Sequence, residues 1–422
     1  MTIHGKEIES SGADLETRYL TGDVAGIGGK IKVHTEDFVV EELPLYAPSG
    51  EGEHTFFKIE KSGLSTFQAV GIIAGALGVP TSRIGYAGLK DKQARTRQVL
   101  SVQGVPPNRV TSLDLSQIRI LWAERNRHKL KVGHLQGNRF TIRVRDVGEA
   151  ALTPCRAILD DLIRRGVPNR YGSQRFGLRG DSWALGRAIV RRDAEAFMNG
   201  LLGQPHHSES PVVHEARSHY DAGRWEEALH LYPRNMPNER HALQTLIRTQ
   251  GDCQKAYSSV PKRFRFFLLS AYQSALFNRV LDARLQSLGR VHAGDLAMKH
   301  PGRSVFRVED EDAEQPRATR FEISPTGPMF GYKMTQASGA QGELEAGVLA
   351  AEGLVLEDFR VGQGISARGE RRALRFQVHE PQLWFDDGIM LRFWLPRGCY
   401  ATTVLSEIMR APEQDVMDLT EL

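Results

Sequence analysis

The stretch Gly85–Gln98 reads GYAGLKDKQARTRQ and holds one carboxylate, Asp91, in a loop punctuated by glycine. The cations close to Asp91 in the sequence are Arg83, Lys90, Lys92, Arg95 and Arg97. Nearby cations favour the ionised form of a carboxylate. An ionised and well-positioned aspartate can act as a covalent nucleophile, and the cations suit a polyanionic substrate. Taken alone, the stretch also fits a turn in which Asp91 forms an ion pair with Lys90 or Lys92.

Positive charge is concentrated around this loop. Residues 81–145 contain 14 lysines and arginines but only 3 acidic residues, a net charge of +11, whereas the whole chain carries +4. Such a basic segment is the expected electrostatic footprint of a nucleic-acid partner. A solvated basic face without a ligand is the alternative interpretation.

Length and composition indicate an ordinary soluble protein. With 422 residues, 41% hydrophobic and 25% charged, the chain should form two or three domains. Its cysteines, Cys155, Cys253 and Cys399, are far apart and form no CxxC motif, which fits a reducing cytoplasm and signals no zinc site. The longest apolar stretch, residues 69–80, is too short for a membrane span, and the N-terminus lacks the apolar core of a signal peptide. We therefore expect a cytoplasmic protein without membrane association.

The hydrophobic pattern predicts strands and helices along the whole chain. Ser65 and Gln68 form a capping-box pattern at the start of a helix that Gly78 and Pro80 end. Further helices are expected from Thr153 to Gly166, over much of 180–260, and over 264–288 and 401–409. Alternation predicts strands over 30–34, 55–59, 98–105, 118–122, 129–132, 140–145 and 390–395. The strands expected over 129–132 and 140–145 have their cations on one face, so a half-buried sheet with a basic outer face is a plausible RNA platform.

Motifs of several other enzyme classes are missing from the sequence. It has no G-x-S-x-G, no H-E-x-x-H and no P-loop. The run Gly26–Gly29 is too short for a dinucleotide fingerprint, which also weakens an RNA methyltransferase as a rival. His206, His207 and His214 form a loose cluster in a polar stretch, and we interpret them as exposed residues and not as metal ligands.

Seven motifs stand in the order typical of one family, and together they cover roughly residues 30–410. They are Glu36–Glu42, Gly50–His54, Ala87–Lys92 with Thr96 and Gln98, Gly137–Phe140, Val167–Gly177, Ala271–Asn278 and Leu395–Thr402. Any one of them could arise by chance, but the ordered set is highly specific. The chain therefore resembles the TruD-type tRNA pseudouridine synthases.

This resemblance implies isomerisation of a uridine in tRNA, typically uridine 13, to pseudouridine, with no metal and no organic cofactor. Asp91 matches the nucleophile of the family, and Lys32 matches the basic residue held near it. The residues that match the lining of the uracil pocket are Phe38, Asn138, Phe140 and Tyr400. The family usually has phenylalanine at the last of these positions, so the Tyr400 hydroxyl is a departure that needs a polar partner. Ser65 also departs, because asparagine is common there.

The implied chemistry agrees with these residue types. A base cannot turn over inside a stack, so the uridine must be extruded, and aromatic side chains can accept it. Asn138 can bond both a donor and an acceptor edge of uracil. Asp91 could attack the sugar or take a proton while a glycal-like intermediate forms, and both routes stay open. From the pattern alone, Phe38 and Phe140 could be core residues, Lys32 a solvated strand residue, Asn138 a turn residue, and Tyr400 a packing residue.

The basic residues of the same region are expected to contact tRNA phosphates; they are Lys90, Lys92, Arg95, Arg97, Arg127, Lys129 and Arg139. The expected fold is α+β: a pseudouridine synthase catalytic core with a mostly antiparallel mixed sheet, plus an inserted α/β TRUD domain. We expect a leader over 1–28, the catalytic domain over 29–166 and 375–422, and the inserted domain over 167–374, with a basic cleft between the domains that holds Asp91. The resemblance implies a monomer with tRNA as its partner and no protein partner. The rival from another class is a non-catalytic RNA-binding protein that uses the same basic cleft.

Overall fold

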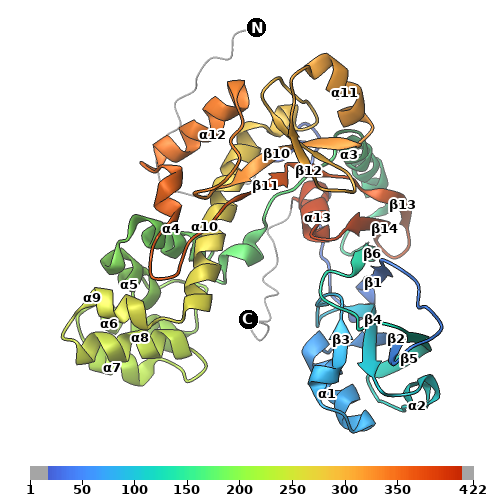
Figure 1. The fold of residues 1–422 in the computed structure, drawn as a ribbon, viewed down its shortest axis with the longest axis horizontal. Coiled ribbons are helices and arrows are strands. Elements are labelled where there is room, and N and C mark those ends of the chain that lie inside the picture. Colours follow the sequence, from blue (N-terminus) through green and yellow to red (C-terminus); the bar gives the residue numbers. More distant parts are fainter. Residues whose placement is uncertain (1–17, 411–422) are drawn as a thin grey trace. The chain divides into compact units, whose positions relative to one another are not determined.

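The computed structural model describes residues 18–410, and these form two compact units (Figure 1). The first, here called the split unit, comprises residues 21–167 and 376–410. The second, the inserted unit, comprises residues 168–375 with residues 18–20. The chain passes between the units at two short segments that pair with each other, β7 (Val167–Pro168) and β12 (Arg375–Phe376).

The split unit is built on an eight-stranded sheet in the order β13-β14-β6-β1-β4-β2-β5, with β3 paired to β4. All of its neighbouring strands pair antiparallel except β1 and β4, which are parallel, so the sheet is mixed and mostly antiparallel as expected. The strands are β1 (Phe38–Pro44), β2 (His54–Ser62), β3 (Ile84–Tyr86), β4 (Arg95–Gln103), β5 (Ile118–Asn126), β6 (Leu135–Val144), β13 (His379–Phe385) and β14 (Ile389–Pro396).

Helix α1 (Thr66–Leu77) shows how closely local signals determine this unit. The Ser65 hydroxyl accepts the Gln68 N–H and the Gln68 side chain accepts the Ser65 N–H, which confirms the capping box. Gly78 ends the helix in the left-handed conformation, with φ 66°. Ala69, Ile73 and Leu77 of α1 form one apolar cluster with strand residues that include Phe57, Ile59, Leu100 and Val102. The helix therefore covers one face of the β2 and β4 strands.

The other helices of the split unit are α2 (Pro107–Thr111), α3 (Leu152–Arg165) and α13 (Ala401–Met409). Helix α3 packs against α13 and β13. The two sequence segments of the split unit, residues 21–167 and 376–410, therefore pack together. The helix expected over 401–409 is confirmed at both of its bounds.

Two expected strands are wrong. Residues 30–34 do not form a strand: Lys30 makes an isolated bridge to Arg145, and Lys32 then takes the left-handed conformation with φ 58°. Residues 129–132 form a loop and turn instead of a strand, because the backbone N–H of Gly133 bonds the carbonyl of Ala87. In both segments apolar and polar residues alternate as in a strand, but the backbone turns instead of pairing. The first segment then contacts Asp91 through Lys32, and the second contacts Ala87 through Gly133.

The inserted unit is mostly helical. Its helices are α4 (Ser182–Arg191), α5 (Ala194–Leu202), α6 (Pro211–Asp221), α7 (Trp225–Leu231), α8 (Pro237–Arg248), α9 (Cys253–Ser259), α10 (Lys262–Ala283), α11 (Glu311–Thr319) and α12 (Gly339–Ala351). A four-stranded antiparallel sheet has the order β11 (Glu370–Ala373), β10 (Ile323–Met329), β8 (Leu296–Lys299) and β9 (Val305–Arg307). Helices α10 and α11 both pack against β10. Helix and sheet thus occur side by side in this unit, as in the α+β class.

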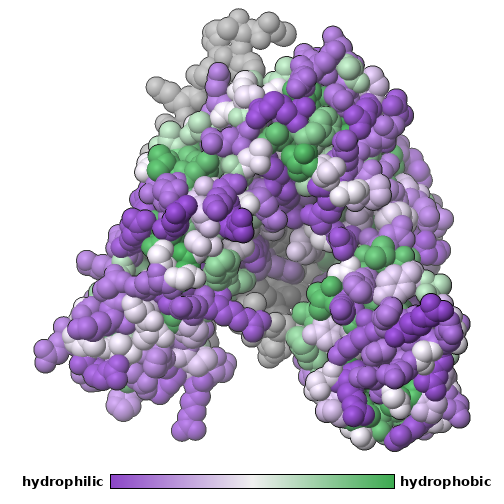
Figure 2. Space-filling model, viewed as in Figure 1, coloured by the Kyte–Doolittle hydropathy of each residue, from purple (hydrophilic) through white to green (hydrophobic). Residues whose placement is uncertain are grey.

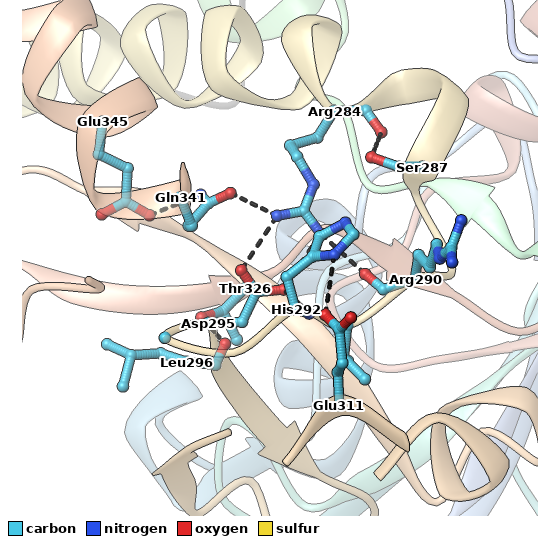
Figure 3. Close-up of polar contacts among 12 residues, drawn as sticks. Arg284, Ser287, Arg290, His292, Asp295, Leu296, Glu311, Thr326, Gln341 and Glu345 are labelled. Atoms are coloured by element: carbon cyan, nitrogen blue, oxygen red, sulfur yellow. Dashed lines mark hydrogen bonds and ion pairs between the residues drawn. The ribbon is translucent and has the colours of Figure 1, made fainter. Parts of the chain in front are cut away.

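A buried polar network holds part of the inserted unit together (Figure 3). The Arg284 guanidinium, at the end of α10, donates to both carboxylate oxygens of Asp295 at 3.1 Å and to the Gln341 side chain at 2.6 Å. Gln341 in turn donates to Glu345 at 2.6 Å, and Arg371 on β11 meets Glu345 with two bonds of 2.7 Å. Since all five side chains are buried, each charge depends on its partners.

The face of the molecule shown in Figure 2 is mostly hydrophilic, with scattered apolar residues. No helix in the described part of the chain is both long enough and apolar enough to cross a membrane.

Candidate active site around Asp91

Asp91 lies in the loop between β3 and β4 of the split unit and presents its carboxylate to solvent. Its side chain is 55% exposed, whereas the Lys32 side chain beside it is only 9% exposed. The Lys32 ammonium donates to Asp91 Oδ2 at 3.0 Å. The carboxylate is therefore open on one side and held by a nearly buried cation on the other, a geometry that fits a positioned nucleophile or base.

Lys32 reaches this position through an unusual backbone. Its φ of 58° is in the left-handed region, which costs a residue with a side chain about 1–2 kcal/mol. The ammonium also lies 4.7 Å from the centroid of the Phe38 ring, within the range of a cation–π contact. A strained backbone of this kind persists only where surrounding contacts fix it. At Lys32 these contacts are the hydrogen bond to Asp91 and the cation–π contact with Phe38.

Phe38 and Phe140 lie on neighbouring strands, and both are buried. Their rings are 6.2 Å apart in an edge-to-face arrangement, and Phe140 also contacts Phe393 at 5.7 Å. Phe38 is thus the ring that connects Lys32 to the aromatic core of the sheet. The structure brings Lys32, Phe38, Phe140 and Asp91 into one connected group.

Asn138 projects from the same face of β6 as Phe140, because residues two apart on a strand share a face. It stands opposite Glu42 of β1 in the sheet register. Its Oδ1 atom is buried and accepts no hydrogen bond from any residue that the structure describes. A buried acceptor without a donor is costly, so this atom is suited to receive an N–H from a ligand.

Tyr400 directly precedes α13 and is 49% exposed. Leu395, on the preceding strand β14, pairs with Asn138 in the sheet. Within residues 18–410, no hydrogen bond, ion pair or ring contact joins Tyr400 to Asp91, Lys32 or Phe38. Its place in a uracil pocket stays a prediction.

The expectation that Lys90 contacts RNA phosphates is wrong. Lys90 is only 5% exposed, and its ammonium lies 2.6 Å from the Glu42 carboxylate, which is 1% exposed. The other oxygen of Glu42 accepts the backbone N–H of Val99 at 3.2 Å. A lysine in this position fixes the loop from inside the unit and cannot meet solvent-borne phosphate.

The remaining cations of the predicted RNA-binding set lie nearer the surface, but most of them form ion pairs. Arg95 pairs with Glu36 at 2.8 Å, Arg97 with Glu60 at 2.7 Å, Arg139 with Glu380 at 2.9 Å, and Arg127 with Glu51. Lys129 donates to the Ser82 carbonyl at 2.5 Å, and Lys92 is half-buried next to Asp91.

These carboxylates are the acidic partners of the ion pairs and reduce the field of the basic segment. Burial pushes the pKa of Glu60 up, but the hydrogen bond and charge of Arg97, with the charge of Arg119, hold that pKa below its ordinary value. The acidic partners of Arg95, Arg97 and Arg127 come from residues 36–60, before the basic segment begins. The charge excess of residues 81–145 is therefore partly neutralised at the surface.

Sequence reasoning missed several residues that hold the Asp91 loop: Glu42, Lys61 and Thr66. Period-2 alternation could have found two of them. Glu42 follows Phe38 and Val40 on the buried face of β1, and Lys61 follows Phe57 and Ile59 on the buried face of β2. A charged residue at a buried strand position needs a buried partner and so signals a network.

In the described part of the chain, no group of three or more His, Cys, Asp or Glu side chains is placed to bind a metal ion. The ring centroids of His206 and His207 lie 4.1 Å apart, and the rings are tilted by 35° to each other.

Comparison with known proteins identifies the family of this chain. The family model of tRNA pseudouridine synthase D (TruD) matches residues 14–408. A tRNA pseudouridine synthase D of Geobacter metallireducens is 47% identical over 401 residues, which are 95% of this chain and 99% of that protein. The Geobacter sulfurreducens protein of the same name is 46% identical over 94% of this chain and 98% of its own length.

A solved structure agrees. A crystal structure of a Methanosarcina mazei protein assigned to tRNA pseudouridine synthase D matches with a TM-score of 0.84 and 28% identity, over 93% of this chain and 96% of the other. The region that the family model matches, residues 14–408, includes every residue discussed around Asp91. This chain belongs to the tRNA pseudouridine synthase D (TruD) family.

Proposed function

We propose that this protein isomerises uridine 13 of tRNA to pseudouridine, with Asp91 as the nucleophile. The observation that carries the proposal is the Asp91 carboxylate, which is open to solvent and bonded at 3.0 Å by the nearly buried Lys32 ammonium. Family membership supplies the reaction class, and the geometry supplies a side chain able to perform it.

The reaction conserves every atom of the uridine. The bond from N1 of the base to C1′ of the ribose breaks, and a bond from C5 to C1′ forms. The proton on C5 leaves, and N1 gains one. Asp91 either attacks C1′ and is later displaced by C5, or removes a ribose proton so that a glycal-like intermediate forms. Both routes need one carboxylate next to the sugar, and neither changes the oxidation state of the nucleotide.

The neighbouring side chains fit the handling of a flipped uracil. Lys32 orients the Asp91 carboxylate and balances its charge before substrate arrives. The unpartnered Oδ1 of Asn138 suits the N3–H of uracil, and its amide N–H suits a carbonyl oxygen. The exposed ring of Tyr400 could stack on the extruded base, a contact worth about 1–3 kcal/mol. Phe38 and Phe140 form the apolar base of this region.

We assign the catalytic role to the split unit, because Asp91, Lys32, Phe38, Asn138 and Tyr400 all belong to it. The inserted unit then corresponds to the TRUD domain of the family. tRNA is the partner, and a monomer suffices since one chain contains every residue named.

The test compares Asp91→Asn with Asp114→Asn, an exposed aspartate on a loop of the same unit. A tRNA transcript with uridine 13 is incubated with each variant, and pseudouridine is mapped at single-nucleotide resolution. We expect Asp91→Asn to give no detectable product and to bind the transcript within about 3-fold of wild type, because cations hold the phosphates. Asp114→Asn should behave as wild type.

Pseudouridine formed by Asp91→Asn would contradict the assigned nucleophile. Product at another position, or on a transcript with cytidine 13, would contradict the site. If the wild-type protein binds the transcript tightly but forms no pseudouridine, the protein is instead a non-catalytic RNA binder.

A further inference from the structure

Lys61 is a fully buried lysine directly beneath the Asp91 loop. It is the penultimate residue of β2, is 1% exposed, and follows the core residues Phe57 and Ile59 on the same face of the strand. Its ammonium donates to three backbone carbonyls: that of Leu64, that of Lys90 at 3.5 Å and that of Asp91 at 3.1 Å. An ammonium has three N–H donors, so it can donate to all three of these carbonyls.

Other buried side chains fix the residue before Asp91. The backbone N–H of Lys90 donates to the Thr66 hydroxyl at 2.9 Å, and that hydroxyl donates to the Gln98 side chain at 3.2 Å. The Lys90 ammonium bonds Glu42 at 2.6 Å. Lys61 adds a tether one residue further along, at the carbonyl of Asp91 itself.

Two ammonium groups therefore hold Asp91 at its two ends. Lys32 bonds the carboxylate and Lys61 bonds the backbone carbonyl, so the direction of the bond from Cα to the side chain is constrained. The loop between β3 and β4 forms no strand pairing at this residue, and a carbonyl tether takes the place of a ladder bond.

We propose that Lys61 is a positioning residue that acts through the backbone of Asp91, an inference that rests on the proposed role of Asp91 in catalysis. Lys61 does not touch the substrate. It sets the position of the Asp91 Cα, and a displacement of about 1 Å at a nucleophile can lower a rate by about 100-fold. Lys61 thus affects the rate of the chemical step and not the affinity for tRNA.

The primary test uses Lys61→Met, which keeps a long apolar side chain in the buried slot and removes the ammonium. The matched control is Lys58→Met on the same strand, since Lys58 faces the opposite side of the sheet and pairs with Glu41 at 2.5 Å. Single-turnover kinetics on a tRNA transcript give the rate of the chemical step, and filter binding gives Kd. We expect the rate of Lys61→Met to fall by about 100-fold while its Kd stays within about 3-fold of wild type. Lys58→Met should keep both values within about 3-fold.

A second variant separates the ammonium from folding. Lys61→Ala leaves a slot that propylammonium fits, because the deleted atoms are three carbons and one nitrogen. Propylammonium should restore at least 10-fold of the lost rate, and 1-propanol, which has similar size but no charge, should not. Equal rescue by both compounds, or a Lys61→Met rate above half that of wild type, would overturn the proposal. A loss of rate matched by an equal loss of tRNA affinity would overturn it as well.

Hydrogen exchange tests the tether independently of activity. Without the Lys61 ammonium, the Lys90 amide that bonds Thr66 should exchange at least 10-fold faster, while amides in β6 exchange as in wild type. Unchanged exchange at Lys90 would refute the positioning role even if activity fell. Faster exchange in a protein whose wild type forms no pseudouridine would keep the tether and reject the proposed function.

Discussion

Replacing Lys90 tests the correction that the structure makes to the predicted RNA contacts. Lys90→Met removes a cation that is 5% exposed and leaves Glu42, which is 1% exposed, without its charged partner. Removal of one member of a buried ion pair costs about 3–5 kcal/mol. Glu42 keeps the hydrogen bond from the Val99 N–H at 3.2 Å, which satisfies one of its oxygens. We therefore expect a loss near the lower end, about 3 kcal/mol of unfolding free energy.

The assay is urea denaturation at pH 7 for wild type, Lys90→Met, Glu42→Gln and the double variant. Glu42→Gln removes the negative charge but can still accept the Val99 N–H. In the double variant neither charge is buried alone, so its loss should be smaller than the sum of the single losses by at least about 2 kcal/mol. The salt dependence of tRNA binding, measured on folded Lys90→Met, should have the wild-type slope, because the ammonium never meets a phosphate.

Three results would refute this reasoning. Lys90→Met that unfolds at the same urea concentration as wild type would show that the pair is not buried. A slope of log K against log salt that falls by about one unit would show that Lys90 contacts a phosphate after all. Additive losses in the two single variants would show that Lys90 and Glu42 do not interact.

Three further outcomes are expected. Lys32→Gly and Lys32→Ala should both lose activity, but thermal melting should show the glycine variant more stable by about 1 kcal/mol, because glycine accepts the left-handed backbone that the structure gives to residue 32; equal melting would contradict the strain. Steady-state kinetics should find Tyr400→Phe close to wild type and Tyr400→Ala weaker by about 1–3 kcal/mol of transition-state binding; equal damage would give the hydroxyl a role. Burial raises the pKa of Glu352, but the hydrogen bond and charge of Arg279 bring it below the ordinary value of 4.5. Glu352→Gln should therefore cost about 1.5–3 kcal/mol at pH 7, and this cost should shrink as pH falls below the ordinary value of 4.5, because a native carboxylate with a lowered pKa is protonated only there; a cost independent of pH would contradict the ionised pair.

Local signals made the regular elements predictable. The capping box at Ser65 and the glycine at 78 define α1 because they act within one helical turn. The alternation of β6 places Phe140, Ile142 and Val144 on its buried face, as the pattern indicates. These features depend on neighbours in the sequence, and a single chain displays them directly.

The Asp91 loop was less predictable, because its partners come from distant parts of the chain. Asp91 and Lys32 are 59 residues apart, and their contact requires a left-handed backbone at residue 32. That residue is a lysine and not a glycine or asparagine, so the sequence does not indicate this conformation. Strand alternation over residues 30–34 indicated the opposite, an extended segment with Lys32 in solvent. Only the family resemblance placed Lys32 beside Asp91, and the residues in contact now give that placement a physical basis.

A count of charges along the sequence does not identify which cations stay unpaired at the surface, for a related reason. The net charge of +11 over residues 81–145 describes a segment of sequence, whereas RNA meets a surface. Strand β1 and the turn before it bring Glu36 to Arg95, and strand β2 brings Glu60 to Arg97, because sheet pairing joins these segments. A cation paired in this way has already exchanged part of its hydration for a carboxylate and gains less from a phosphate than an exposed cation does. The electrostatic footprint of this protein is therefore set by the sheet register, which decides which basic residues keep their charge available, and not by the composition of the basic segment.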